Sequence, residues 1–243
     1  MPHRPHRLRL PRTRLRLVAL ERAPGRYDLV RSGLDVVRFR RHQTPGRADL
    51  ARPKPTPPVI SASLERALRA CIEAHEGQLR KAADPAPYAV HPLHMALLLA
   101  RFGACEAVVE AALLHDTVED SADWTAERLA AEFGDKVAAI VAELTEDKSL
   151  SWTERKELGI EHVEHMSADA VLVKGADKLH NLSSLAAELQ TAADPQEVWA
   201  DFKGGREATL AMSQALVEAL APRLPKNLAQ ELQEAFARVS KLA

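Results

Sequence analysis

The sequence predicts an all-α domain over residues 59–243, preceded by a basic, proline-rich extension over residues 1–58. From Val59 onward, apolar residues recur at helical spacing, and almost every interruption of this pattern is a glycine or a proline. The extension instead holds nine of the 15 prolines and ends in PKPTPP, which is typical of a stiff linker. We therefore expect one helical domain attached to a poorly ordered extension.

The domain opens with two predicted helices that are joined by a proline-rich loop. The first begins with Ser61 or Ser63 as N-cap and closes near Gly77, because serine hydroxyls cap helix starts and glycine favours helix ends. In RKAADPAPYAVHP, three prolines within eight residues exclude a continuous helix. The second helix starts at Pro92, since a proline at the first helical position loses no hydrogen bond.

Further segments show apolar residues at helical spacing, and the chain contains no internal repeat. They are CEAVVEAALLHDTVED, TAERLAAEFGDKVAAIVAELTED with one or two helices, ERKELGIEHVEHM, DAVLVKGADKLHNLSSLAAEL, DFKGGREATLAMSQALVEAL and the terminal NLAQELQEAFARVSKLA. The pattern therefore indicates a bundle of helices.

Composition limits the class of protein. Apolar residues make up 46% of the chain, which suffices for a hydrophobic core. The two cysteines, Cys71 and Cys105, lack CxxC spacing and fit a reducing compartment. No apolar run reaches membrane-spanning length, and the N-terminus lacks the apolar core of a secretion signal. We expect a soluble, cytoplasmic protein with no membrane partner.

Charge divides the chain into two regions. Residues 1–58 carry a formal charge of +11 and the remainder carries −12, although the whole chain is at −1. A basic arm can bind nucleic acid by counterion release, but no nucleic-acid-binding motif accompanies it. A transit peptide and translation begun upstream of the natural start are the other interpretations. The stretch RLRLPRTRLRLVAL alternates at period two and could form a strand or hairpin.

The stretch AALLHDTVEDSADW places His115, Asp116, Glu119 and Asp120 on an apolar helix. Residues three and four apart share a helix face, so one imidazole and three carboxylates are expected along a single edge. Stacked carboxylates repel one another, and nothing basic lies in the same helix. The pattern predicts a divalent cation at this edge.

Two further segments supply the remaining ligands of such a site. His91 begins the preceding predicted helix, and Asp177 lies on an apolar helix with Asn181 one turn later. Two imidazoles and two carboxylates, from His91, His115, Asp116 and Asp177, suit Mn²⁺, Zn²⁺ or Fe²⁺ better than Ca²⁺. A bound metal lowers the pKa of water from ~15.7 toward ~7, so it makes hydroxide available near neutral pH.

These residues carry a resemblance. The adjacent His-Asp of HDTVED, with His91 upstream and Asp177 downstream, resembles the HD-superfamily metal-dependent phosphohydrolases. HEGQLRKAADPAPYAVHP resembles the H-x-G-Q-x-R-K…P-Y…H-P signature of the (p)ppGpp hydrolase domain of RelA/SpoT homologues and small alarmone hydrolases. ALLHDTVED, AELTEDKS and VKGADKLHNL resemble the next three blocks of that domain, in the expected order. The resemblance covers roughly residues 63–220.

The resemblance implies an HD-domain helical bundle that removes pyrophosphate from the 3′ position of the guanine alarmone, with Mn²⁺, in the stringent response. His91, His115, Asp116 and Asp177 match the metal ligands. Glu119 and Asp120 match the pair that orients the attacking water and handles protons. Arg80 matches a residue that reaches the active centre. The substrate-binding positions of the family match Lys81, Lys148 and Asn181.

The sequence also departs from the family pattern and leaves alternatives open. Ser183 stands where the family commonly has an arginine, and the later arginine and tyrosine contacts have no clean match, with Trp199, Lys203 and Arg206 as nearby candidates. Another substrate, such as NADPH or a deoxynucleoside triphosphate, is one alternative. A catalytically silent, nucleotide-sensing HD module is another. Too few residues follow the predicted domain for a synthetase domain, so we expect a stand-alone hydrolase.

Several other charged residues have a structural interpretation beside the functional one. Lys174 and Lys178 flank Asp177, where they could bind phosphate or form a solvated helix edge. His94 lies three residues after His91 and could compete for the metal. The remaining histidines, among them His75 and His180, are expected to be surface or core residues.

Overall fold

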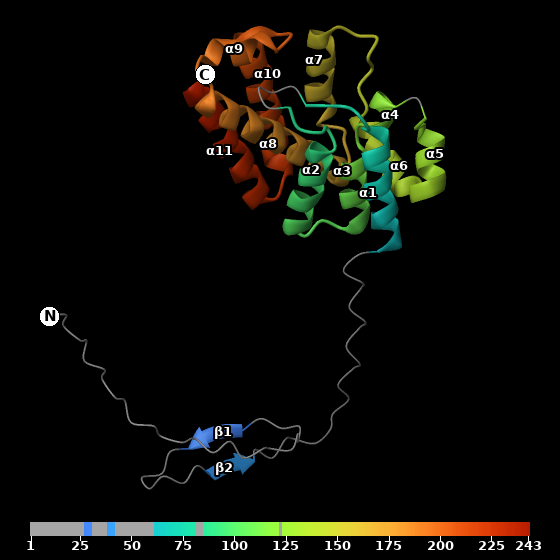
Figure 1. Cartoon of the computed structure of the whole chain (residues 1–243), viewed down its shortest axis with the longest axis vertical. Helices are drawn as coiled ribbons and strands as arrows, with labels where there is room; N and C mark the ends of the chain where they lie inside the picture. Colours follow the sequence, from blue (N-terminus) through green and yellow to red (C-terminus); the bar gives the residue numbers. More distant parts are fainter. Residues whose placement is uncertain (1–26, 31–37, 42–60, 81–84, 122) are drawn as a thin grey trace, which may run out of the picture. The chain divides into compact units, whose positions relative to one another are not determined.

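The computed structural model describes residues 27–30, 38–41, 61–80, 85–121 and 123–243 (Figure 1). The chain divides into two compact units, residues 1–56 and residues 57–243, and each is described by itself. In the first unit, β1 (Tyr27–Val30) and β2 (Arg38–Arg41) form an antiparallel pair with Tyr27 opposite Arg41. The expected strand in RLRLPRTRLRLVAL lies outside the described residues, as does most of the extension.

The second unit is helical, as the sequence predicts. Its α-helices are α1 (Ala62–Ala74), α2 (Val90–Arg101), α3 (Glu106–Leu114), α4 (Thr117–Asp120), α5 (Ala126–Phe133), α6 (Asp135–Leu144), α7 (Trp152–His162), α8 (Ala168–Thr191), α9 (Pro195–Ala200), α10 (Gly205–Leu220) and α11 (Lys226–Leu242), with a 3₁₀ turn η1 (Ala221–Arg223) before the last. Within the described part of this unit, an isolated β-bridge joins Leu79 and Pro87. The all-α prediction is confirmed for this domain.

Local chemistry sets the helix boundaries. Of the two expected caps of α1, Ser61 is the N-cap, because its side chain accepts the backbone N–H of Leu64 at 2.9 Å. Gly134 has a φ of 86° and separates α5 from α6, so the segment that predicted one or two helices forms two. Ser151 and Glu154 form a capping box at the start of α7.

Two predicted helices begin or continue differently. The expected helix over residues 105–120 is interrupted after Leu114 and resumes at Thr117 as α4. The Thr117 hydroxyl donates to the Leu114 carbonyl at 2.7 Å, and His115 Nδ1 donates to the Ala112 carbonyl at 2.9 Å. These bonds pair the carbonyls of Ala112 and Leu114, which offsets helix hydrogen bonds that are interrupted where the chain turns. The predicted helix over 201–220 starts only at Gly205, after the short α9.

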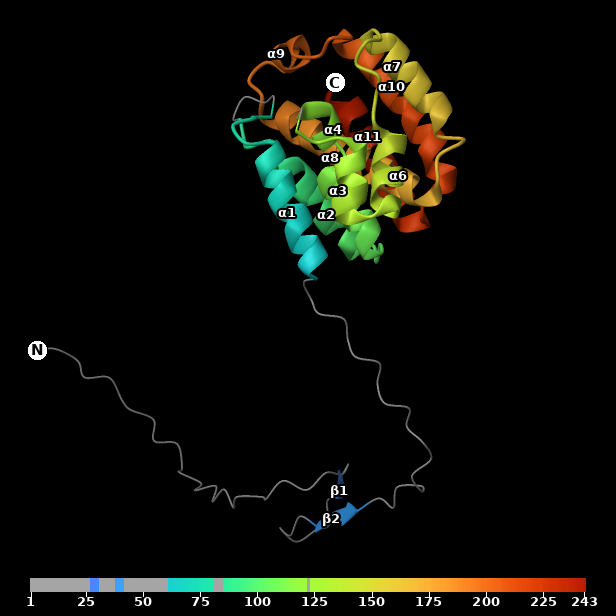
Figure 2. The ribbon, with the colours of Figure 1, turned by 90° about the vertical axis from the view of Figure 1, so that its right-hand side faces the viewer.

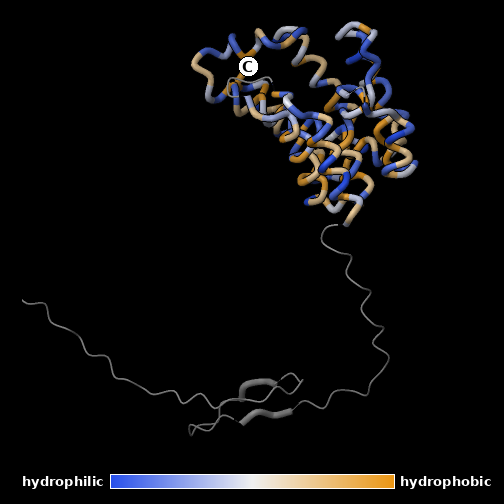
Figure 3. The backbone as a smooth tube through the Cα atoms, turned by 45° about the vertical axis from the view of Figure 1, so that its right-hand side comes forward, coloured by the Kyte–Doolittle hydropathy of each residue, from blue (hydrophilic) through white to orange (hydrophobic). Residues whose placement is uncertain are grey.

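Helix α8 runs through the middle of the domain. It packs against α11, α2, α3 and α6, and Figure 1 shows α9 to α11 on one side of it and α3 to α6 on the other. Figure 2, turned by 90°, shows α7 beside α10. Fully buried side chains such as Met95, Leu113 and Leu182 fill the space between the helices. Hydrophobic and hydrophilic residues alternate along the helical part of the chain, as Figure 3 shows. No described helix is both long and apolar enough to cross a bilayer.

Candidate metal centre and the cleft above it

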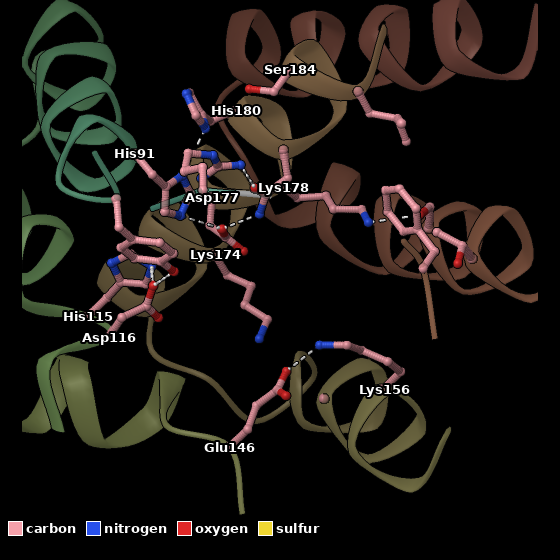
Figure 4. Close-up of a pocket in the computed structure, with 18 of the residues that line it drawn as sticks. His91, His115, Asp116, Glu146, Lys156, Lys174, Asp177, Lys178, His180 and Ser184 are labelled. Carbon is pink, nitrogen blue, oxygen red and sulfur yellow. Dashed lines mark hydrogen bonds and ion pairs between the residues drawn. The ribbon is translucent and has the colours of Figure 1, made fainter. Parts of the chain in front are cut away.

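A cleft of about 1160 Å³ opens between α2, α4, α7, α8 and α10. Its metal end is formed by side chains from three regions of the chain, namely the start of α2, the turn between α3 and α4, and the middle of α8 (Figure 4). The opposite wall, defined here as the part of the cleft lined by α7, α9, α10 and residues 201–203 between α9 and α10, together with Lys174 and Lys178 of α8, carries several lysines.

Three predicted ligands meet at the metal end. One donor atom each from His91, His115 and Asp177 lies within 4.8 Å of the others. His91 and His115 are buried, and Asp177 is partly buried. His91 Nε2 lies 3.2 Å from Asp177 Oδ1. The fourth predicted ligand, Asp116, is not in this group of three, but its Oδ2 lies 3.0 Å from His115 Nε2.

Electrostatics at this end is dominated by the pairing of histidines with aspartates. Burial alone would raise the pKa of Asp116, yet His115 and the Tyr88 hydroxyl lower it to about 2. Burial would lower the pKa of His115, yet Asp116 raises it to about 9. His91 likewise keeps the pKa of the Asp177 carboxyl well below its ordinary value, against the effect of burial. Both carboxylates are therefore ionised near neutral pH.

This donor set suits a divalent cation. The Nε2 atoms of the two histidines point toward the aspartate carboxylates, and Nδ1 of each is engaged elsewhere. Imidazole nitrogen and carboxylate oxygen are ligands that Mn²⁺, Fe²⁺ and Zn²⁺ accept. A cation would take the place of the proton on His115, so the residues can hold a metal in this position.

Glu119 and Asp120 lie beside the metal end and are tied to one loop. Glu119 Oε1 accepts the backbone N–H of Glu146 at 2.8 Å. Lys148 donates to Asp120 Oδ1 at 2.7 Å and to the Glu119 carbonyl at 2.7 Å. The carboxylates are thus relieved partly by Lys148 from another element, which corrects the expectation that a cation alone would relieve them. Burial and the nearby Asp116 raise the pKa of Glu119.

Arg80 and Asn181, predicted from the family motif, are hydrogen-bonded to each other. Arg80 donates to Asn181 Oδ1 at 3.0 Å, and Asn181 Nδ2 donates to Asp177 Oδ1 at 2.6 Å. Both residues line the cleft. Asn181 therefore touches a candidate metal ligand as well as the space above it. Lys81, a predicted substrate contact, lies outside the described residues.

Two residues that contact the candidate ligands were not predicted as site residues. Tyr88 donates to Asp116 Oδ2 at 2.5 Å, and Nδ1 of His180 lies 2.8 Å from Nδ1 of His91. Both belong to quoted motif blocks, so their place in the motif was the available signal. His94, which the sequence suggested as a competing metal ligand, is not among the three residues whose donor atoms meet at the metal end. Its ring packs against His180, with the centroids 4.6 Å apart.

The opposite wall is cationic and partly apolar. Lys174, Lys178 and Lys203 line it. Lys178 donates to the Ser213 hydroxyl at 2.8 Å, and burial lowers its pKa to about 8. Lys156 is paired with Glu146 at 2.8 Å. The wall therefore offers positive charge opposite the acidic metal end.

The three residues suggested for the later family contacts differ in their surroundings. Lys203 lines the cleft. Trp199 is buried and packs against Phe202, with ring centroids 5.3 Å apart. Arg206 is exposed and is not among the residues that line the cleft. Of the three, Lys203 is the one with access to a bound ligand.

Comparison with protein-family models gives a match to the HD domain over residues 67–210. This stretch contains all four candidate ligands together with Glu119 and Asp120. The guanosine-3′,5′-bis(diphosphate) 3′-pyrophosphohydrolase MESH1 of Xenopus tropicalis is 46% identical over 127 residues, which cover 51% of this chain and 70% of the relative. The Drosophila melanogaster protein of the same name is 39% identical over 148 residues, covering 58% of this chain and 82% of the relative.

Comparison with solved structures agrees with these matches. A structure described as a metazoan ortholog of SpoT that hydrolyzes ppGpp superposes with a TM-score of 0.64 and 33% sequence identity. The match covers 73% of this chain and 96% of that one. The helical domain thus has nearly the whole of that protein as its counterpart.

Proposed function

The chain belongs to the HD-domain family, within its (p)ppGpp hydrolases, and from this premise we propose that it removes the 3′-pyrophosphate of (p)ppGpp with the help of a divalent cation, which we take to be Mn²⁺. We assign this activity to residues 59–243. Residues 1–58 are proposed to form an extension that takes no part in catalysis.

The proposal rests on one observation. At the metal end of the cleft, one donor atom each from His91, His115 and Asp177 lies within 4.8 Å of the others. These residues are up to 86 positions apart in the sequence and come from separate elements. Buried imidazoles beside a partly buried carboxylate are costly to assemble unless they are paired or bind an ion. With Asp116 beside His115, they would hold the cation.

When bound, the cation lowers the pKa of water and polarises phosphoryl oxygens, so hydroxide becomes available near neutral pH. Hydrolysis then forms a bond from the water oxygen to the phosphorus attached to the 3′-oxygen and breaks the bond from that phosphorus to the 3′-oxygen. Glu119, whose pKa is raised, accepts the proton that the water loses. The departing 3′-oxygen takes up one proton, which balances the proton that Glu119 accepts from water. Asp120 and Lys148, which are paired with each other, lie beside Glu119.

Substrate charge fits the distribution of side chains in the cleft. A guanosine bearing two diphosphates is strongly anionic, and the acidic metal end alone would repel it. Lys174, Lys178 and Lys203 on the opposite wall offset this repulsion. Arg80, Lys148 and Asn181 lie nearer to the metal end and are proposed to contact the ribose and the 3′-pyrophosphate, with Lys81 as a further contact.

The test is a substrate panel with the purified full chain and Mn²⁺. We expect ppGpp to give GDP and pyrophosphate, identified by chromatography and mass spectrometry, and activity to vanish on chelation and to return on adding Mn²⁺. NADPH and deoxynucleoside triphosphates serve as the competing substrates. Faster turnover of either one would replace the proposed substrate, whereas tight binding of ppGpp without products would favour a sensing module.

A further inference from the structure

We propose that His180 is a positioning residue that sets the tautomer and the orientation of His91, so that His91 presents a hydrogen-free Nε2 to the cation. The inference rests on the proposed metal centre. It gives a function to a histidine that the sequence alone suggests is an ordinary core residue.

The first observation is the contact between the two rings. His91 Nδ1 and His180 Nδ1 are 2.8 Å apart, which is a hydrogen-bond distance, and Figure 4 shows the pair next to Asp177. One of these nitrogens must carry a hydrogen and the other a lone pair. His91 Nε2 faces Asp177 Oδ1 at 3.2 Å, on the side of the ring where the candidate metal ligands meet. If Nδ1 of His91 is the donor, its Nε2 is free to coordinate.

The second observation is the contrast with His115. Nδ1 of His115 lies 2.9 Å from the Ala112 carbonyl, and a carbonyl can only accept. The backbone therefore fixes the hydrogen of His115 on Nδ1. The partner of His91 Nδ1 is the His180 ring instead of a backbone carbonyl, so the tautomer of His91 depends on His180. Partners of this kind are needed because metal-binding histidines are held in orientation through their second nitrogen.

The third observation is that His180 is itself held in place. It is 7% exposed, and the His94 ring lies against it at 76° with centroids 4.6 Å apart. His91 and His94 are three residues apart on α2, so both touch the same ring of α8. Asp177 is three residues before His180 on α8. One helix thus positions a carboxylate ligand and the partner of an imidazole ligand.

The experiment measures Mn²⁺ affinity of the full chain by the electron paramagnetic resonance signal of free Mn²⁺, without substrate. His180→Ala removes the partner of His91 and should weaken Mn²⁺ binding about 10- to 100-fold. His180→Asn places an amide oxygen near the position of Nδ1, so it should recover most of the affinity. His165→Ala, which removes an exposed histidine of the loop before α8, is the matched control and should bind Mn²⁺ like the wild type.

Thermal unfolding of the metal-free proteins verifies that each variant folds. Equal affinity of His180→Ala and the wild type would overturn the inference and leave the proposed function intact. Equal loss in the folded His180→Ala and His180→Asn variants would also overturn it, because the effect would then reflect packing. A wild type that binds no Mn²⁺ would overturn both the inference and the metal-dependent function.

Discussion

At the metal end of the cleft, Asp116, Asp120 and Asp177 each accept a hydrogen bond from a residue of another element or another turn. On the opposite wall, Lys174 and Lys203 line the cavity, and neither has a hydrogen-bonded carboxylate partner among the residues described by the structure, although Lys174 helps to lower the pKa of the Asp177 carboxyl. The carboxylates of the metal end are thus hydrogen-bonded within the protein, whereas the ammonium groups of the opposite wall remain available to bind an anionic ligand. The difference separates two tasks. The metal end determines the chemistry, and the wall determines which molecule is held there.

The strongest test of this division is Asp116→Ala. It removes a candidate ligand, the partner of His115 and the acceptor of the Tyr88 hydroxyl. We expect loss of bound Mn²⁺, measured by elemental analysis, and a fall in turnover of about 10³-fold or more, because the low pKa of metal-bound water is lost. Asp123→Ala, at an exposed position after α4, should keep both. Full activity of Asp116→Ala would remove Asp116 from the ligand set.

Glu119→Gln should separate metal binding from proton transfer. The amide oxygen can still accept the N–H of Glu146, so the fold and the bound Mn²⁺ should persist. Without a proton acceptor, kcat should fall about 10²- to 10⁴-fold. Steady-state kinetics together with metal content checks this, and Glu161→Gln on the exposed face of α7 is the control. A variant that loses its Mn²⁺ as well would show that Glu119 belongs to the metal network.

Lys148→Met should alter the pH dependence of the reaction. Glu119 acts as a base when it is ionised, so activity falls as the pH drops through its pKa, which burial raises above the ordinary value. Lys148 opposes this rise. Its removal should therefore move the acidic limb of kcat/KM to higher pH, and KM should rise about tenfold.

The control for this variant is Lys241→Met near the C-terminus of α11, which should leave the profile unchanged. An acidic limb that stays in place in Lys148→Met would show that Glu119 is not the group that titrates.

Lys174→Ala addresses the opposite wall and should have the smallest effect. Because every candidate ligand and Glu119 are kept, we expect KM for ppGpp to rise about fivefold with kcat changed less than about twofold. The same measurement with the 5′-monophosphate analogue localises the contact, since the increase in KM should shrink if Lys174 binds the 5′-diphosphate. A large fall in kcat would contradict the division of tasks between the two sides.

Much of the fold followed from the sequence because local signals determine it. Helical spacing of apolar residues and the breaks at Gly134 and near Gly77 are properties of short segments. The interruption between α3 and α4 was missed, because both halves have helical periodicity. It depends on the Thr117 hydroxyl and the His115 ring, which bond to carbonyls of the preceding turn. Such side-chain bonds compete with the helix and leave no trace in the apolar pattern.

The candidate ligands followed from motif spacing, but their supporting contacts did not. His180 lies 89 residues from His91, and Tyr88 lies 28 residues from Asp116. Contacts over such separations require knowledge of how α2, α4 and α8 pack. Lys148 was expected at the substrate, and its ion pair with Asp120, also 28 residues away, appears only in three dimensions. The residue types of a site are local information, whereas their pairing is tertiary.

Helix α8 is continuous over 24 residues and carries Lys174, Asp177 and Asn181 on its way past the cleft. The seven-residue interval from Lys174 to Asn181 corresponds to about 10 Å along the axis. Because an unbroken helix is stiff, the distance between Lys174 and Asn181 is fixed, and Asp177 lies between them. A polyanion long enough to span this distance can contact both residues at once, whereas a shorter one contacts only one of them.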